Sequence, residues 1–131
     1  MPTIEVTKDN FEEVITKNEM VILDFWASWC GPCKAFAPTF DAASEKYPDV
    51  VFGKVNTEEQ QELAGHFQIR SIPSVMLFRE QVMLFGQPGA MPAAGLDGVI
   101  GQAKALDMGK VRAEIAEEQA QRGADGKSGD R

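Results

Sequence analysis

Short apolar runs recur along most of the chain, and they alternate with stretches in which apolar residues are spaced three or four positions apart. The runs have the lengths that strands usually have. The run over residues 20–26 is almost continuous, which is typical of a strand buried on both faces of a sheet. The pattern therefore predicts five strands, at residues 4–7, 20–26, 50–55, 74–79 and 82–86.

The segments between these strands have the apolar spacing of helices. A short helix is predicted after Asp9 or Asn10, either of which suits an N-cap. A longer helix is predicted over residues 33–47, and Pro38 is expected to kink it. Two more helices follow: one that a capping box of Thr57 and Gln60 opens and that ends near Phe67, and one that begins at Pro92.

The order of these elements defines the fold class. Strands and helices alternate through the first half, which indicates parallel strands joined by right-handed crossovers. A tight turn at residues 79–81 then joins the last two strands as a hairpin, and a final helix covers the sheet. We therefore expect an α/β protein with a central mixed sheet of about five strands and helices on both faces.

The pattern changes after residue 106, where Asp107 and Gly109 interrupt the helical spacing. Residues 110–121 are helical in character, but Val111 and Ile115 are their main apolar residues. Beyond them the chain consists of Gly, Asp, Ser and charged residues, a composition typical of disorder. The predicted organisation is a folded domain at 1–106, a helical extension at 107–122 and a disordered tail at 123–131.

Composition and charge limit the possible functions. The chain has 131 residues, a length that suits one domain. Its formal net charge is −7 and it has no basic cluster, so nucleic acid and anionic membranes are unexpected partners. The first residues lack the features of a signal peptide, which favours a cytoplasmic protein, although a periplasmic chain after signal removal has the same appearance. We expect a monomer.

The two cysteines are the strongest chemical feature of the sequence. Cys30 and Cys33 lie between a predicted strand and a predicted helix, with Gly31 and Pro32 between them. A helix N-terminus stabilises a thiolate, so Cys30 is the expected nucleophile. Cys33 follows one turn later, where it can attack a mixed disulfide formed at Cys30. A disulfide spanning so short a loop stabilises a fold little, which favours a reactive pair over a structural one.

A metal site is the alternative interpretation of the pair. Zinc sites usually have four ligands, and besides the two cysteines the chain has one histidine, His66, far away in the sequence. We therefore expect no metal, and we interpret His66 as a surface or structural residue.

Residues 24–34, Asp-Phe-Trp-Ala-Ser-Trp-Cys-Gly-Pro-Cys-Lys, resemble the active-site stretch of the thioredoxin family. The resemblance continues through Ile69-Arg70-Ser71-Ile72-Pro73-Ser74 and Pro88-Gly89-Ala90, and it covers about residues 3–106 in order. It implies the thioredoxin fold, with the segment after residue 106 as an additional C-terminal helix. The combination of these motifs is far more specific than an isolated Cys-x-x-Cys.

The resemblance also implies roles for individual residues. Asp24 is expected to be a buried carboxyl that accepts the proton of Cys33, and Lys54 to lie beside it and modulate it; a purely structural Asp24–Lys54 pair is the alternative. Pro73 matches the family's cis-proline, and the backbone of Ile72 is expected to pair with an extended substrate segment. The implied docking patch around Cys30 consists of Trp29, Gly31, Pro32, Ile72, Pro73, Gly89 and Ala90.

The function that follows is a protein-disulfide reductase that maintains thiol redox state in the cytosol. No bound cofactor is expected, because the redox centre is the cysteine pair itself and the electrons come from NADPH through a separate thioredoxin reductase. Disulfide-containing client proteins are the other expected partners. A binding module that acts as a chaperone-like holder or complex subunit, and a periplasmic oxidase or isomerase, are the alternatives. The intact cysteine motif argues against the first, and Gly31-Pro32 argues against the second.

Two positions depart from the family pattern. Gln81 stands in the predicted hairpin turn, where family members often have glycine, so the type of turn is left open. Pro88 stands before Gly89, where a β-branched apolar residue is common. Because proline has no N–H, we expect one hydrogen bond to be lost at this edge and client choice to shift.

Overall fold

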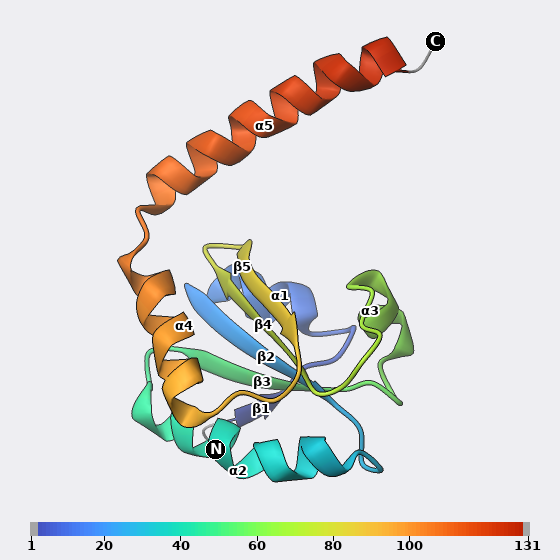
Figure 1. The fold of residues 1–131 in the computed structure, drawn as a ribbon, viewed down its shortest axis with the longest axis vertical. Helices are drawn as coiled ribbons and strands as arrows, with labels where there is room; N and C mark the ends of the chain where they lie inside the picture. Colours follow the sequence, from blue (N-terminus) through green and yellow to red (C-terminus); the bar gives the residue numbers. More distant parts are fainter. Residues whose placement is uncertain (1–2, 130–131) are drawn as a thin grey trace.

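The computed structural model describes residues 3–129, and its centre is a five-stranded sheet with the strand order β1-β3-β2-β4-β5 (Figure 1). β1, β3 and β2 are parallel to one another, whereas β4 is antiparallel to β2 and β5 is antiparallel to β4. The predicted mixed sheet of five strands is therefore confirmed. The strands are β1 (Thr3–Glu5), β2 (Met20–Trp26), β3 (Val51–Asn56), β4 (Ser74–Arg79) and β5 (Val82–Pro88).

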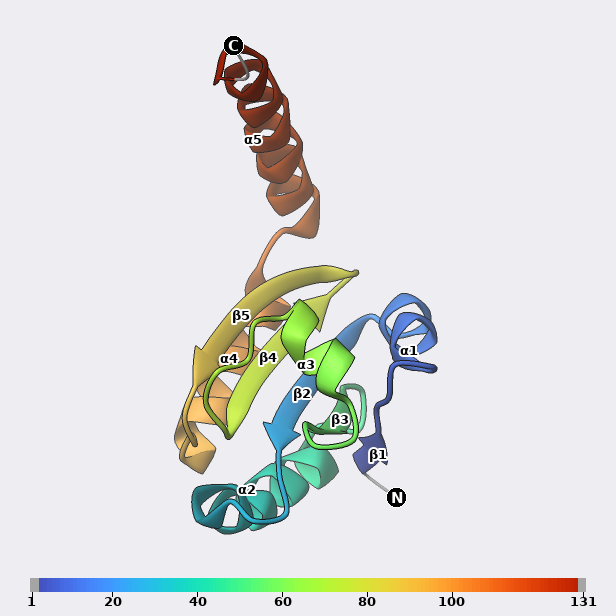
Figure 2. The same cartoon turned by 90° about the vertical axis from the view of Figure 1, so that its right-hand side faces the viewer.

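Helices pack on both faces of this sheet (Figure 2). They are α1 (Phe11–Lys17), α2 (Gly31–Lys46), α3 (Gln61–His66) and α4 (Ala93–Ala105). One apolar core joins α2 and α4 to the sheet, and a second joins α1 and α3 to its opposite face. Because side chains alternate along a strand, β2 serves both cores: Ile22 faces α2 and α4, and Leu23 faces α1 and α3.

The predicted capping box of α3 is wrong. Thr57 Oγ1 donates a hydrogen bond to the carbonyl oxygen of Trp26 at 3.0 Å, and Gln60 Oε1 accepts one from the Lys8 amide at 2.8 Å. Both side chains are therefore engaged outside the helix. α3 begins at Gln61, four residues after Thr57, and it has no side-chain cap.

The β4–β5 hairpin contains two residues in the left-handed region. Glu80 has a φ of 51° and Gln81 a φ of 71°, the combination that a two-residue type I′ turn requires. Glycine and asparagine favour this conformation, and neither is present here. The turn therefore forms as a tight hairpin in spite of Gln81, at some cost in backbone strain.

The last helix, α5 (Met108–Gly129), projects away from the sheet (Figure 1). Its first two turns are attached to the domain: Met108 is 4% exposed and Arg112 forms an ion pair with Glu80. The helix is longer than the stretch predicted from the sequence, since it continues through residues 123–129. Gly, Asp and Ser each cost a helix at most about 1 kcal/mol relative to alanine. A helix that has already formed gains a hydrogen bond with each added residue, so such residues need not end it. Residues 130–131 of the predicted tail lie outside the described residues.

Candidate active site

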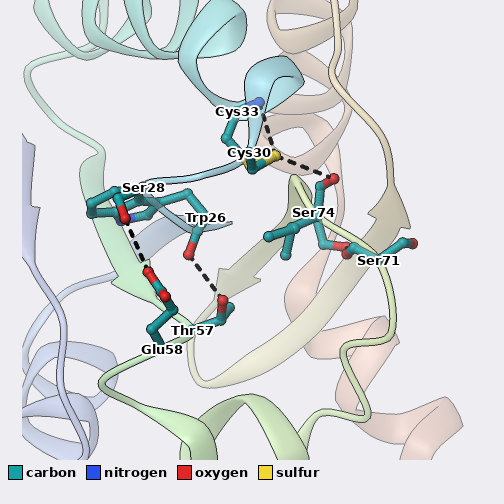
Figure 3. Close-up of a disulfide and its surroundings, with 9 residues drawn as sticks. Trp26, Ser28, Cys30, Cys33, Thr57, Glu58, Ser71 and Ser74 are labelled. Atoms are coloured by element: carbon teal, nitrogen blue, oxygen red, sulfur yellow. Dashed lines mark hydrogen bonds between the residues drawn. A yellow bond between two sulfur atoms is a disulfide. The ribbon is translucent and has the colours of Figure 1, made fainter.

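The two cysteines occupy the junction between β2 and α2. Cys30 is the N-cap residue of α2, with an extended backbone, and its sulfur accepts a hydrogen bond from the Cys33 amide at 3.2 Å. The two residues are joined as a disulfide, with their Cα atoms 5.2 Å apart (Figure 3). Gly31 and Pro32 form the first turn of the helix, where proline costs no backbone hydrogen bond. The sequence thus places the leading sulfur at the positive end of a helix.

A loop from the other half of the chain covers the cysteine pair. The carbonyl oxygen of Ile72 lies 3.7 Å from Cys30 Sγ, and the Ile72–Pro73 bond is cis, as the resemblance implies. The Gly89 amide donates a hydrogen bond to the Pro73 carbonyl at 2.7 Å. Cys30 is only 4% exposed, whereas the neighbouring Trp29 is 68% exposed. The structure therefore brings Ile72, Pro73 and Gly89 to the cysteine pair. Of the other predicted docking residues, Gly31, Pro32 and Ala90 are exposed, whereas Pro73 itself is buried.

Asp24 is completely buried, and neither of its carboxyl oxygens has a hydrogen-bond partner. Its position in β2 places it on the same face as Ile22, which is the face that α2 covers. Its pKa is raised to about 7: burial is the main cause, the charge of Lys54 lowers the pKa in part, and the charge of Asp41 adds to the rise. A carboxyl with such a pKa can hold or release a proton near neutral pH.

Lys54 lies beside Asp24 on the adjacent strand, since the two residues are register partners in β2 and β3. Within residues 3–129, no ion pair joins them. The Lys54 ammonium instead lies 5.5 Å from the centre of the Trp26 ring. Lys54 therefore acts on the carboxyl through its charge, not through a direct bond.

Sequence reasoning missed several side chains that hold the site in place. Ser28 Oγ donates to Glu58 Oε1 at 3.1 Å, which ties the loop before Cys30 to the loop after β3 (Figure 3). Ser74 Oγ donates to the Ser71 carbonyl at 2.6 Å and so braces the loop that carries Pro73. No sequence signal identifies the Ser28–Glu58 contact, because the partners are 30 residues apart and each is an ordinary surface residue in isolation.

The remaining side chains give no sign of a second reactive site in the described part of the chain. Among the side chains that the structure describes (residues 3–123), no group of three or more His, Cys, Asp or Glu has the arrangement of a metal site. His66 is exposed and lies edge-on to Phe67, with ring centroids 4.9 Å apart, which fits a surface residue. None of the described helices is both long enough and apolar enough to span a membrane.

Comparison with known proteins agrees with this geometry. The thioredoxin family model matches residues 2–102. A putative thioredoxin 2 of Streptomyces coelicolor is 59% identical over 121 residues, which cover 92% of this chain and 90% of the relative. A thioredoxin of Buchnera aphidicola is 42% identical over 90 residues, covering 67% of this chain and 83% of the relative.

Solved thioredoxin structures share the fold of this chain. A mutant thioredoxin of Halobacterium salinarum has a TM-score of 0.75 at 26% identity, and the match covers 81% of this chain and 95% of that one. The thioredoxin of Plasmodium falciparum has a TM-score of 0.70 at 33% identity, with 76% and 97% covered.

The fold and the cysteine pair define a thiol–disulfide oxidoreductase that needs no bound cofactor. The chain belongs to the thioredoxin family, and thiol–disulfide reduction through a close cysteine pair is its activity.

Proposed function

We propose that this protein reduces disulfides in client proteins, with Cys30 as nucleophile and Cys33 as resolving thiol. The observation that carries the proposal is the position of Cys30: its sulfur caps α2 and accepts the Cys33 amide, while the Ile72 loop lies against it. Amides that point at a sulfur from a helix N-terminus favour the thiolate, which is the nucleophilic form.

In the first step, the Cys30 thiolate attacks one sulfur of the client disulfide. A bond forms between Cys30 and that sulfur, the client disulfide breaks, and the second client sulfur leaves as a thiolate that takes a proton from water. The backbone of Ile72 pairs with the client segment, and the docking patch of Trp29, Gly31, Pro32, Ile72, Pro73, Gly89 and Ala90 surrounds the reacting sulfurs.

In the second step, Cys33 loses its proton and attacks Cys30 Sγ. This forms the Cys30–Cys33 disulfide and releases the remaining client sulfur, so two electrons have passed from the dithiol to the client. Asp24 accepts the Cys33 proton, with Lys54 adjusting its pKa. The full burial of Asp24 and its pKa of about 7 support this role, because such a carboxyl exchanges protons at physiological pH.

The oxidised pair then has to be reduced by a partner. We infer that a separate, flavin-dependent thioredoxin reductase supplies the electrons from NADPH. We also infer that the protein acts as a monomer in the cytoplasm, where a dithiol is kept reduced.

Insulin reduction tests the proposal. The protein is mixed with thioredoxin reductase, NADPH and insulin, and the loss of NADPH is followed. We expect turnover that Cys30→Ser abolishes and that His66→Gln, a change at an exposed residue outside the pair, leaves intact. Cys33→Ser is expected to accumulate mixed disulfides with proteins of a cell lysate, visible on non-reducing gels. Full insulin reduction by Cys30→Ser would disprove the assignment.

A further inference from the structure

A second concave site lies next to the cysteine pair, on the face of the sheet that α1 and α3 occupy. It is a cavity of about 270 Å³ between the segment that follows α3 and the strands β4 and β5. Figure 2 shows this segment running from α3 in front of β4, beside β5. The floor and walls are mainly apolar and include Phe67, Ile69, Met76, Met83 and Gly86.

The cavity exists because β5 carries little side-chain volume at this point. A Cβ atom added at Gly86 would lie 3.7 Å from Met76 Cγ and 3.8 Å from Met83 Sδ, which are ordinary contact distances. Both methionines line the cavity, so a side chain at Gly86 would point toward it and take up part of its volume. Met83 remains 49% exposed, which leaves an apolar surface open to solvent here.

The cavity is continuous with the proposed client site. Ser71, Ser74 and Pro88 line it, and they are the direct sequence neighbours of the docking residues Ile72, Pro73 and Gly89. Ser74 and Pro88 are also register partners at the end of β4 and β5 nearest the cysteines. A client segment that pairs with the backbone of Ile72 therefore lies one loop, residues 71–73, away from the cavity.

Charge distinguishes one rim of the cavity. Arg70 lines it and is exposed, and among the side chains described, those of residues 3–123, it has no ion-pair partner. The chain as a whole has a formal net charge of −7, so most of its charged groups repel a carboxylate. Arg70 is a cation at the rim of the cavity, and it therefore favours a ligand with a carboxylate at this point.

We propose that this cavity is a specificity subsite for client proteins: it binds an apolar side chain of the client segment, and Arg70 pairs with an acidic residue next to that side chain. The proposal rests on the proposed function and refines it, since it names the chemical class of the preferred clients. Most of the selectivity comes from the apolar side chain, because an exposed ion pair contributes much less than burial of a leucine.

Peptide substrates test the proposal without altering the protein. Each peptide contains one cysteine as a mixed disulfide with thionitrobenzoate, whose release is followed by absorbance. A Leu-Glu pair is placed two to five residues from the cysteine on either side, and matched peptides carry Ala-Glu, Leu-Gln or Ala-Gln. For at least one placement we expect kcat/KM to fall about fivefold when Leu becomes Ala, and about twofold when Glu becomes Gln.

Two variants with matched controls locate the effect. Gly86→Leu fills the cavity and is expected to abolish the leucine preference, whereas Gly98→Leu, at an open position on α4, retains it. Arg70→Gln is expected to abolish the glutamate preference, whereas Lys110→Gln on α5 retains it. Reduction of the small disulfide dithionitrobenzoate is expected to be unchanged in all four variants.

The outcomes separate this subsite from the basic activity. Equal rates for all peptides at every placement, or a leucine preference that survives Gly86→Leu, would overturn the subsite while leaving the reductase intact. Failure of the wild-type protein to reduce dithionitrobenzoate or any peptide would instead contradict the proposed function.

Discussion

Among individual residues, Asp24 connects the stability of the fold with the proposed proton transfer, because its carboxyl is fully buried and has no hydrogen-bond partner. Its carboxyl has a pKa of about 7 in the folded chain because it is buried, against 3.8 ordinarily. Ionisation of this group therefore adds no cost to folding well below pH 3.8, where it is protonated in both states. The cost grows as the pH rises toward 7 and is constant above it, at roughly 4 kcal/mol.

Asp24→Asn is accordingly expected to stabilise the protein, and to do so in a pH-dependent way. The gain in the free energy of unfolding, measured by urea denaturation, should be near zero at pH 3.5 and reach about 3 to 4 kcal/mol at pH 8. Glu45→Gln, at an exposed carboxyl on α2 that is not among the charges acting on Asp24, is the control and should show little change. An equal gain for Asp24→Asn at both pH values would mean that ionisation of the carboxyl is not its cause.

Asp24 could be singled out from the sequence because it is a lone carboxyl in an apolar strand. The cysteine pair could be singled out because its spacing is specific. The contact of Ser28 with Glu58 was not predictable, since it depends on two loops that only the folded sheet brings together. The same limit applies to Arg70: its place in a family motif was visible, but the cavity beside it was not.

Among the elements, the β4–β5 hairpin is where the sequence fits its structure least well. Gln81 has a φ of 71°, a conformation that costs an L-residue about 1 kcal/mol and glycine almost nothing. Gln81→Gly is therefore expected to raise the free energy of unfolding by about 0.5 kcal/mol, after allowance for the greater freedom of glycine in the unfolded chain. Thermal unfolding and urea denaturation measure this gain.

The same substitution elsewhere in β5 provides the control. Gln87→Gly lies in the regular part of the strand, so it should destabilise the protein by a few tenths of a kcal/mol or more. If Gln81→Gly destabilised the protein as well, the strain attributed to the turn would be absent.

Most elements were predictable because their apolar periodicity is strong, and the errors arose where side chains have competing partners. Thr57 and Gln60 form a plausible capping box in the sequence, but Trp26 and Lys8 take their hydrogen bonds in the fold. Of the two N-cap candidates for α1, Asp9 and Asn10, Asn10 occupies the N-cap position, yet its side chain accepts from the Thr7 amide and does not cap the helix. Long-range contacts decide such cases, and local pattern does not include them.

At the scale of the whole molecule, α5 is joined to the domain through the end of α4. Arg79 Nη1 donates to the carbonyl oxygens of Ala103 and Leu106, at 2.7 and 2.9 Å, and so fixes the end of α4 where α5 begins. Figure 1 shows α5 leaving the domain on the side remote from α2. Arg79 pairs with Met20 at the start of β2, whereas the cysteines follow the end of β2. We propose that residues 1–106 form the catalytic domain and that the segment from 107 is an accessory extension.

The comparisons support this division. The Streptomyces coelicolor relative aligns over 121 residues and so shares part of the extension, whereas the solved thioredoxins cover only 76–81% of this chain while being nearly complete themselves. The family match over residues 2–102 likewise ends before the proposed boundary at residue 106.

Two truncations test how much α5 contributes. A chain that ends after Ala116 keeps the buried Met108 and the Arg112–Glu80 ion pair, so its free energy of unfolding should stay within about 0.5 kcal/mol of the full chain. A chain that ends after Leu106 loses both contacts and should be less stable by about 2 kcal/mol, mainly because a buried methionine is removed. Both should reduce insulin at the full rate, since the cysteine pair lies at the other end of the sheet. A loss of activity after the shorter truncation, with stability retained, would mean that α5 takes part in the reaction and that the division at residue 106 is wrong.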